Sequence, residues 1–160
     1  MIIGKGNVAR VLNDREGAIF FASGVSNSQC TDESQYQREK DLLKVLHNSY
    51  LSLFYFSSLA LDTKLTRYYT HKIQMELLVK EHFKNYNIIR LGNLDWDENP
   101  HTFRNYIKSK QAIGEPVQIK DEWKYMISKE QLLLLTDNLP LTGKNEISIF
   151  GSMKKVKDCL

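Results

Sequence analysis

The stretch LSLFYFSSLALDTKLTRYYTHK, residues 51–72, contains much of what decides the fold. Its first part, Leu51 to Phe56, is a continuous apolar run that predicts a strand buried on both faces. Two small polar residues, Ser57 and Ser58, end this strand. A long amphipathic helix is then expected from about Leu65 to Phe83. A buried strand followed by a helix is the repeating unit of parallel α/β proteins.

The same alternation extends over the rest of the chain. On the N-terminal side we expect strands at Met1 to Ile3 and Ala18 to Phe21, and a helix at about 32–47 with Thr31 as its N-cap. On the C-terminal side we expect strands at Ile88 to Leu91, Pro116 to Ile119 and Ile147 to Phe150, a helix around Phe103 to Ile107, and a helix capped by Ser128. The predicted class is α/β, with a mostly parallel sheet and helices on both faces.

The composition excludes several classes of protein. A chain of 160 residues with 42% hydrophobic residues is sufficient for one core. With 22 Lys and Arg against 19 Asp and Glu, charge alone does not predict nucleic-acid binding. Cys30 and Cys159 are far apart and the four histidines share no spacing, so no disulfide framework and no metal site are expected. Without a long apolar segment, we expect a soluble cytoplasmic protein and no membrane partner.

A glycine motif follows the first predicted strand. Gly4-Lys5-Gly6-Asn7-Val8-Ala9 has the form GxGxxA and is expected to open a short helix through Val8, Val11 and Leu12. In such motifs the glycines allow a tight turn and the close approach of a pyrophosphate, which the helix N-terminus stabilises. The acidic residue that binds the adenosine ribose is expected about 20 residues further on, but residues 25–29 contain none.

Tyr68 and Lys72 form a YxxxK pattern on the helix of the opening stretch, and their i, i+4 spacing places them on one face. A phenol with a pKa of about 10 becomes a useful base near neutral pH only if about 4 kcal/mol of stabilisation favours its anion. A neighbouring ammonium can supply it. The pattern alone is weak, since Tyr and Lys are abundant. The order of glycine turn, small-residue loop, Ser-Ser strand end and YxxxK helix strengthens it. His71, inside the pattern, is expected to face solvent.

This succession resembles the short-chain dehydrogenase/reductase superfamily, in its extended branch of NAD-dependent epimerases and dehydratases. The resemblance implies a shortened Rossmann-like fold and NAD or NADP as cofactor. It implies that Ser58, Tyr68 and Lys72 are catalytic and that Ser57 and Asn93 contact a nucleotide-sugar substrate. It also implies a cofactor site formed by Gly4, Gly6, Asn7, Ala9, Ala22, Ser23, Gly24, Tyr68 and Lys72.

The chain also departs from that family. Its second and third strands are absent, which removes the usual adenosine pocket. Where the family often has an arginine for the diphosphate, this chain has Asp121 and Glu122, with Lys120 or Lys124 as possible substitutes. Lys5 and Arg10 would suit a 2′-phosphate, but the choice between NAD and NADP stays open. We expect a shortened dinucleotide-binding part at residues 1–95 and a small substrate-binding part at 96–160, packed as one unit.

Two functions are consistent with these residues. The first is an NAD(P)-dependent epimerase, dehydratase or reductase in which Tyr68 is the acid/base, Lys72 its partner and Ser58 the clamp for a substrate hydroxyl. The alternative is a noncatalytic relative that serves as a nucleotide-binding or regulatory subunit. In either case the helices at about 32–47 and 65–83 correspond to a dimer interface of the family, so a homodimer is expected. Trp96 and Trp123 either line a substrate pocket or simply pack.

Overall fold

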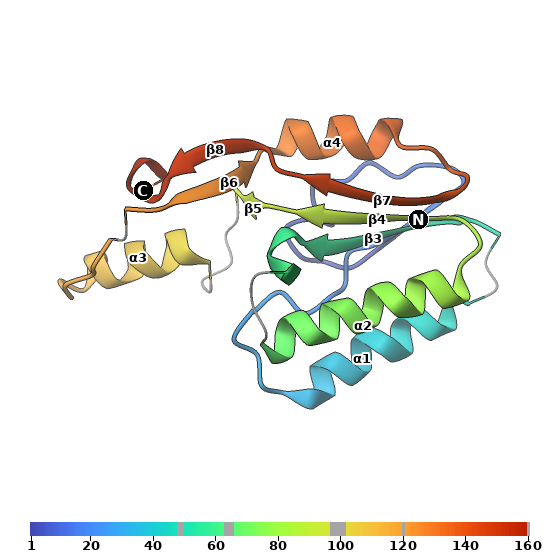
Figure 1. Cartoon of the computed structure of the whole chain (residues 1–160), viewed down its shortest axis with the longest axis horizontal. Coiled ribbons are helices and arrows are strands. Elements are labelled where there is room, and N and C mark those ends of the chain that lie inside the picture. Colours follow the sequence, from blue (N-terminus) through green and yellow to red (C-terminus); the bar gives the residue numbers. More distant parts are fainter. Residues whose placement is uncertain (48–49, 63–65, 97–101, 120, 160) are drawn as a thin grey trace.

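A five-stranded parallel sheet forms the centre of the protein. The computed structural model describes residues 1–47, 50–62, 66–96, 102–119 and 121–159. The sheet has the order β1-β2-β3-β4-β7, and every neighbouring pair is parallel (Figure 1). Its strands are β1 (Ile2–Ile3), β2 (Ala18–Phe21), β3 (Ser52–Ser58), β4 (Tyr86–Leu91) and β7 (Lys144–Ile149). The predicted α/β class with a mostly parallel sheet is confirmed.

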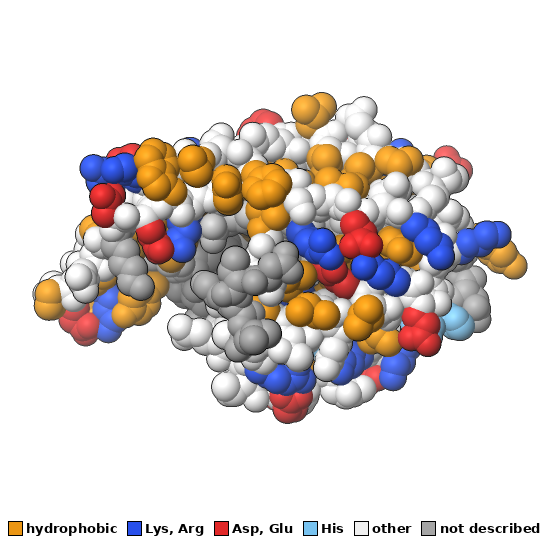
Figure 2. Space-filling model, in the orientation of Figure 1, with side chains coloured by type: hydrophobic (Ala, Val, Ile, Leu, Met, Phe, Trp, Pro, Cys, Tyr) orange, Lys and Arg blue, Asp and Glu red, His pale blue; other side chains and the backbone are white. Residues whose placement is uncertain are grey.

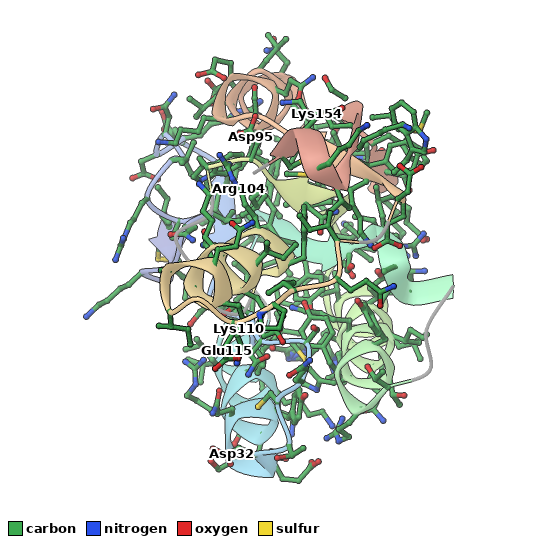
Figure 3. The ribbon with its side chains drawn as sticks, turned by 90° about the vertical axis from the view of Figure 1, so that its left-hand side faces the viewer. Asp32, Asp95, Arg104, Lys110, Glu115 and Lys154 are labelled. Atoms are coloured by element: carbon green, nitrogen blue, oxygen red, sulfur yellow. The ribbon has the colours of Figure 1, made fainter. Side chains whose placement is uncertain are left out.

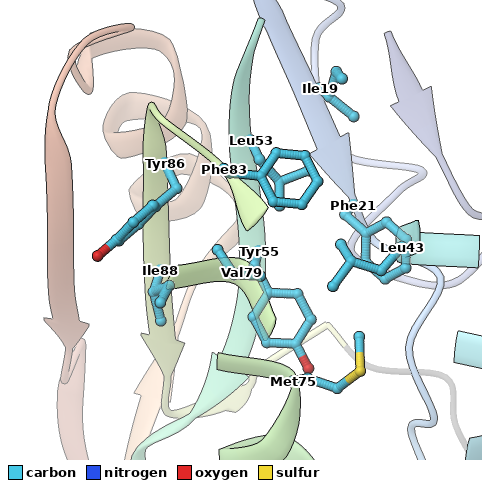
Figure 4. Packing of buried hydrophobic residues seen from close by; sticks show 10 residues of the cluster. All are labelled: Ile19, Phe21, Leu43, Leu53, Tyr55, Met75, Val79, Phe83, Tyr86 and Ile88. Carbon is cyan, nitrogen blue, oxygen red and sulfur yellow. The ribbon is translucent and has the colours of Figure 1, made fainter. Parts of the chain in front are cut away.

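Helices cover both faces of this sheet. Helices α1 (Glu33–Val45) and α2 (Arg67–His82) lie on one face, and α4 (Lys129–Asn138) lies on the other (Figure 1). Every residue of β2 is buried, which explains why its sequence is apolar without alternation. Between the sheet and α1 and α2, Leu43, Met75 and Val79 pack on Tyr55 and its neighbours (Figure 4). Each fully buried large apolar side chain contributes about 1.5–3 kcal/mol.

A second, smaller sheet extends from one end of the first. It contains β5 (Asn93–Leu94), β6 (Trp123–Ile127) and β8 (Ser152–Lys155) in the order β5-β6-β8. Helix α3 (Phe103–Ala112) precedes β6, and the short 3-10 helices η1 (Leu59–Asp62) and η2 (Val156–Cys159) follow β3 and β8. The division into parts 1–95 and 96–160 stays a prediction. Strand β7 of the second part pairs with β4 of the first.

The structure corrects three local predictions. Residues 7–11 form turns instead of a helix, with isolated bonds from the Arg10 N–H to the Gly6 carbonyl and from the Val11 N–H to the Val8 carbonyl. The chain must begin β2 at Ala18, which leaves little length for a helix. Residues 115–119 are not a strand, and Pro116 has no N–H to donate to one. Asp32 caps α1 in place of Thr31, because its carboxylate accepts the Ser34 N–H at 2.9 Å.

Part of the small sheet is apolar at its surface. Figure 2 shows hydrophobic side chains gathered over β6 and β8, where Trp123, Tyr125 and Met153 are exposed. Tyr125 also packs on Phe150, with ring centroids 5.0 Å apart.

Among the described residues, no helix is both long and apolar enough to cross a bilayer.

Candidate active site

The predicted catalytic residues come from segments that adjoin at the carboxyl edge of the main sheet. Tyr68 and Lys72 lie on one face near the start of α2, whose N-cap is Thr66. The Lys72 ammonium reaches the end of β3, where its Nζ lies 3.5 Å from the Phe56 carbonyl oxygen. It also lies 5.9 Å from the centre of the Tyr68 ring. Since Ser57 and Ser58 directly follow Phe56, the predicted phenol, ammonium and hydroxyl groups come from adjoining segments.

A carboxylate that the sequence analysis did not single out binds this ammonium. Glu39, from α1, is fully buried, and its Oε1 lies 3.3 Å from Lys72 Nζ. The same oxygen accepts the Tyr55 hydroxyl at 3.0 Å. Its other oxygen, Oε2, accepts the Val25 N–H at 2.9 Å and lies 3.0 Å from Nε2 of His71. Four partners from α2, β3 and the loop after β2 therefore converge on one carboxylate.

Burial and mutual attraction set the protonation of this pair. Burial opposes the charge of Glu39, but Lys72, His71 and the Val25 N–H together hold its pKa far below the usual value. Burial likewise opposes the charge of Lys72, and the negative Glu39 outweighs it, so the pKa of Lys72 is raised. Burial, followed by the nearby Glu39 charge, raises the pKa of Tyr55 well above its ordinary value. At neutral pH the cluster contains a carboxylate, an ammonium and a neutral phenol.

His71 is a correction to the sequence analysis, because it is completely buried instead of facing solvent. Its ring packs against Tyr36 with centroids 4.6 Å apart. One ring nitrogen faces Glu39, while Nδ1 is buried without a hydrogen-bond partner among the described residues. A neutral imidazole that donates from Nε2 leaves only a lone pair unsatisfied, which costs less than a buried unpaired N–H.

The two serines differ in their hydrogen bonding. Ser58 is half-buried, and its Oγ accepts the Ala60 N–H at 3.2 Å. Ser57 is 7% exposed, and its Oγ is buried without a partner within the described residues. A buried hydroxyl without a partner costs about 1–3 kcal/mol, so Ser57 is the less favourably placed of the two serines.

The glycine turn lies directly against the loop after β2. Gly4 has φ +133°, and a Cβ at this position would come 2.2 Å from the Ala22 carbonyl oxygen, so only glycine fits. A Cβ on Gly6, in contrast, would meet nothing within 4 Å among the described residues. Ala9 is buried, and the Asn7 carbonyl accepts the Trp96 indole N–H at 3.4 Å. The backbone above Gly6 is therefore open, as a bound diphosphate requires.

The loop after β2 covers the ion pair. Arg38 of α1 donates to the Ser23 carbonyl at 3.0 Å and to the Ser23 hydroxyl at 3.3 Å. A Cβ on Gly24 would come 2.6 Å from Lys72 Nζ and 2.8 Å from Glu39 Oε1. A side chain at position 24 would therefore force the loop or one of the buried charged groups to move.

Glu76 and Asn93 both have partners within the protein. Glu76, one turn after Lys72, binds Arg90 through two contacts, of 3.0 Å and 2.5 Å. Asn93 is exposed in β5, and its side-chain amide donates to the Tyr125 carbonyl at 3.1 Å. Lys124 pairs with Glu122 at 3.1 Å, whereas Lys120 lies outside the described residues.

Two hollows lie near these elements. One, of about 120 Å³, is lined by Asp95, Arg104, Met126, Lys154, Asp158 and Cys159. Figure 3 shows Asp95 and Arg104 side by side above α3. A larger open hollow of about 550 Å³ follows the outward side of α1, and none of its lining residues belongs to the predicted site. Ligand pockets usually enclose about 300–1,000 Å³, so the small hollow is no dinucleotide pocket.

Comparison with known proteins confirms the predicted fold. The chain is similar to UDP-glucuronic acid 4-epimerase of Bacillus cereus, with a TM-score of 0.66 and 12% identity over 95% of this chain and 59% of that one. It is similar to the NAD complex of the Bordetella bronchiseptica enzyme WbmH, with a TM-score of 0.68 and 12% identity over 89% and 55%. For the dTDP-glucose 4,6-dehydratase DesIV of Streptomyces venezuelae the TM-score is 0.62, with 12% identity over 89% and 54%.

These similarities have two limits. No protein-family model matches the sequence, and no curated protein matches it either. The chain spans 59% or less of the length of each of those three structures. The chain thus has the fold of a part of each of these three structures, and its function follows only from its own site.

Proposed function

We propose that this protein binds NAD or NADP at the carboxyl edge of the main sheet and acts on a nucleotide sugar as an epimerase, dehydratase or reductase. The observation that carries the proposal is the position of the buried Lys72 ammonium, which lies 5.9 Å from the centre of the Tyr68 ring, 3.5 Å from the Phe56 carbonyl oxygen of β3 and next to Gly24 of the loop after β2. The similarity to enzymes solved with NAD and with nucleotide-sugar ligands supports it.

The residues present fit the central part of a dinucleotide. Gly6 leaves open space for a diphosphate, and the nearby Gly4 lies against the backbone of Ala22 and Ser23. Lys72 donates at 3.2 Å to Tyr55, at 3.3 Å to Glu39 and at 3.5 Å to the Phe56 carbonyl. The last contact is the longest, and a ribose hydroxyl would replace it. When bound, the dinucleotide would supply a hydride acceptor or donor.

Each side chain then has a separate role. Tyr68 would exchange a proton with the substrate hydroxyl, and the Lys72 ammonium would stabilise its phenolate form. Ser58, with Ser57 as its neighbour, would hold the substrate oxygen. Asn93, at the start of the small sheet, would contact the nucleotide sugar.

The test is a titration with NAD and with NADP, followed by turnover of UDP- and dTDP-sugars. We expect Tyr68→Phe to bind the dinucleotide as the wild type does and to lose about 10²–10⁴-fold in turnover. Tyr106→Phe, which changes an exposed tyrosine of α3, is the matched control. Loss of dinucleotide binding in Tyr68→Phe would contradict the assigned role.

A second function is favoured by one observation. All three N–H groups of Lys72 already have an acceptor inside the protein. If neither dinucleotide binds at millimolar concentration, the protein is better described as a noncatalytic nucleotide-binding or regulatory subunit.

The proposed assembly is a homodimer formed by the outward faces of α1 and α2. Val45, Ile73 and Leu77 are exposed there, with Val45 80% and Leu77 59% accessible. Light scattering should give the mass of a dimer, and Leu77→Glu should give that of a monomer. A wild-type monomer at working concentration would contradict the proposal.

A further inference from the structure

The role of Glu39 can be inferred from its contacts. Its two carboxylate oxygens have four polar partners, two for each oxygen. We propose that Glu39 is a positioning residue for Lys72: it keeps the lysine charged and holds its ammonium beneath Gly24 and Val25 of the loop after β2. The catalytic part of this inference rests on the proposed function, whereas the part that concerns charge does not.

The first argument concerns burial. Lys72 is 4% exposed, and an ammonium removed from water reverts to the neutral amine unless a counter-charge compensates it. Glu39 lies 3.3 Å away and is fully buried, so water does not screen the pair. Glu76 acts on Lys72 at longer range and is already bound to Arg90. Glu39 is therefore the carboxylate that maintains the charge of Lys72.

The second argument concerns geometry. A lysine side chain is flexible, so its ammonium has a defined position only when its partners hold it. Glu39 contacts the ammonium with one oxygen and the Val25 N–H with the other. Because Gly24 has no side chain, the loop after β2 can lie in contact with both Lys72 Nζ and Glu39 Oε1. One carboxylate thus fixes the cation and the loop that would lie beside a bound dinucleotide.

The groups that act electrostatically on Lys72 come from three elements. Glu39 belongs to α1, and Tyr55 belongs to β3. Tyr68 and Glu76 belong to α2, as does His71, which reaches the cluster through Glu39. Glu39 and Tyr55 touch the ammonium directly. Replacing Glu39 by glutamine removes the negative charge while keeping the shape of the side chain.

The experiment is an NMR titration of the ligand-free protein with ¹³C at Cε of its lysines, assigned with Lys72→Met. In Glu39→Gln we expect the Lys72 resonance to titrate at least about one pH unit lower than in the wild type, a tenfold weaker proton affinity. Glu33→Gln is the matched control, because Glu33 also lies on α1 and pairs with Arg67 of α2, but at the surface. An unchanged Lys72 titration in Glu39→Gln would overturn the proposal.

A second variant covers the case in which Glu39→Gln does not fold. The double variant Glu39→Gln/Lys72→Met removes both buried charges, so it should be folded and more stable than Lys72→Met alone. A double variant that is no more stable than that single variant would contradict the pairing.

In active protein, Glu39→Gln should move the alkaline limb of the pH profile of kcat to lower pH, because Lys72 then loses its charge at lower pH. Failure to bind a dinucleotide, with the lysine titration as expected, would refute only the proposed function.

Discussion

Two charge networks lie on helix α2, one turn apart, and they differ in their contact with solvent. The inner network joins Lys72 to Glu39, whose side chains are 5% and 0% exposed. The outer network runs from Glu76 through Arg90 to Glu146 and Lys80, with Glu146 40% exposed and Lys80 33%. In the outer network Lys80, Arg90 and Glu146 can exchange their partners for water, whereas Glu76, whose side chain is 5% exposed, and both inner charges cannot. The inner network must therefore be complete, and it is the one beside the candidate site.

The largest effect is expected from Lys72→Met, which leaves the Glu39 carboxylate buried without its cation. Removing one member of a buried pair costs about 3–5 kcal/mol, so urea denaturation should show a loss of this size. Lys80→Met, the equivalent change in the outer network, should cost less than about 1 kcal/mol. Equal losses of stability in Lys72→Met and Lys80→Met would show that burial does not make the inner ion pair more important than the outer one.

The inner network should also govern stability in acid. Because the pKa of Glu39 is lower in the folded protein than its ordinary 4.5, its contribution is complete above about pH 4.5. It is lost as the pH falls toward the folded value, since the unfolded chain then binds more protons. The stability gap between the wild type and Glu39→Gln, about 3 kcal/mol at pH 7, should therefore narrow in acid. Urea midpoints from pH 3 to 7 test this, and a constant gap would contradict it.

A smaller loss of stability is expected from Gly24→Ala, in the loop after β2 that covers Lys72 and Glu39. This change places a methyl group 2.6 Å from Lys72 Nζ, so either the ammonium or the loop must move. Overpacking of this kind costs about 1–3 kcal/mol. Gly6→Ala, in the open glycine turn, should stay within about 0.5 kcal/mol of the wild type. Thermal denaturation of the two variants gives the comparison.

The smallest effect is expected from Glu146→Gln in the outer network. Exposed and half-exposed ion pairs contribute about 0.2–1 kcal/mol and are screened by salt. The loss should be measurable at low ionic strength and should disappear in about 1 M NaCl, where the Debye length is about 3 Å. A loss of stability that persists in 1 M NaCl would show that salt does not screen the outer network, as expected only of a buried network.

The sequence predicted the strands best where they are buried on both faces. The apolar runs at 18–21 and 51–56 predicted two buried strands, and the structure has strands at 18–21 and 52–58. The spacing of Tyr68 and Lys72 correctly placed both residues on one face of a helix. The helix after Gly6 failed because its length depends on where β2 begins, which is a tertiary property. The strand at 116–119 failed because a strand needs a partner and Pro116 cannot donate.

Glu39 illustrates what sequence reasoning missed. It lies in a helix rich in charged residues, where nothing local distinguishes a buried carboxylate from a solvated one. Its position gave one usable signal, because Tyr36, Glu39 and Leu43 follow the i, i+3, i+7 spacing of an inward face. His71 was misassigned for a related reason, since its partner belongs to a helix 32 positions earlier.

The chain passes between the main and small sheets three times, through Gly92 between β4 and β5, through α4 between β6 and β7, and through Gly151 between β7 and β8. At Gly92 and Gly151 the backbone lies so close to β6 that a Cβ would meet the Tyr125 and Met126 carbonyls at 2.8 Å and 2.2 Å. A single connection would allow one sheet to rotate relative to the other, whereas three connections restrict this rotation. In ¹⁵N relaxation both should report one common rotational correlation time.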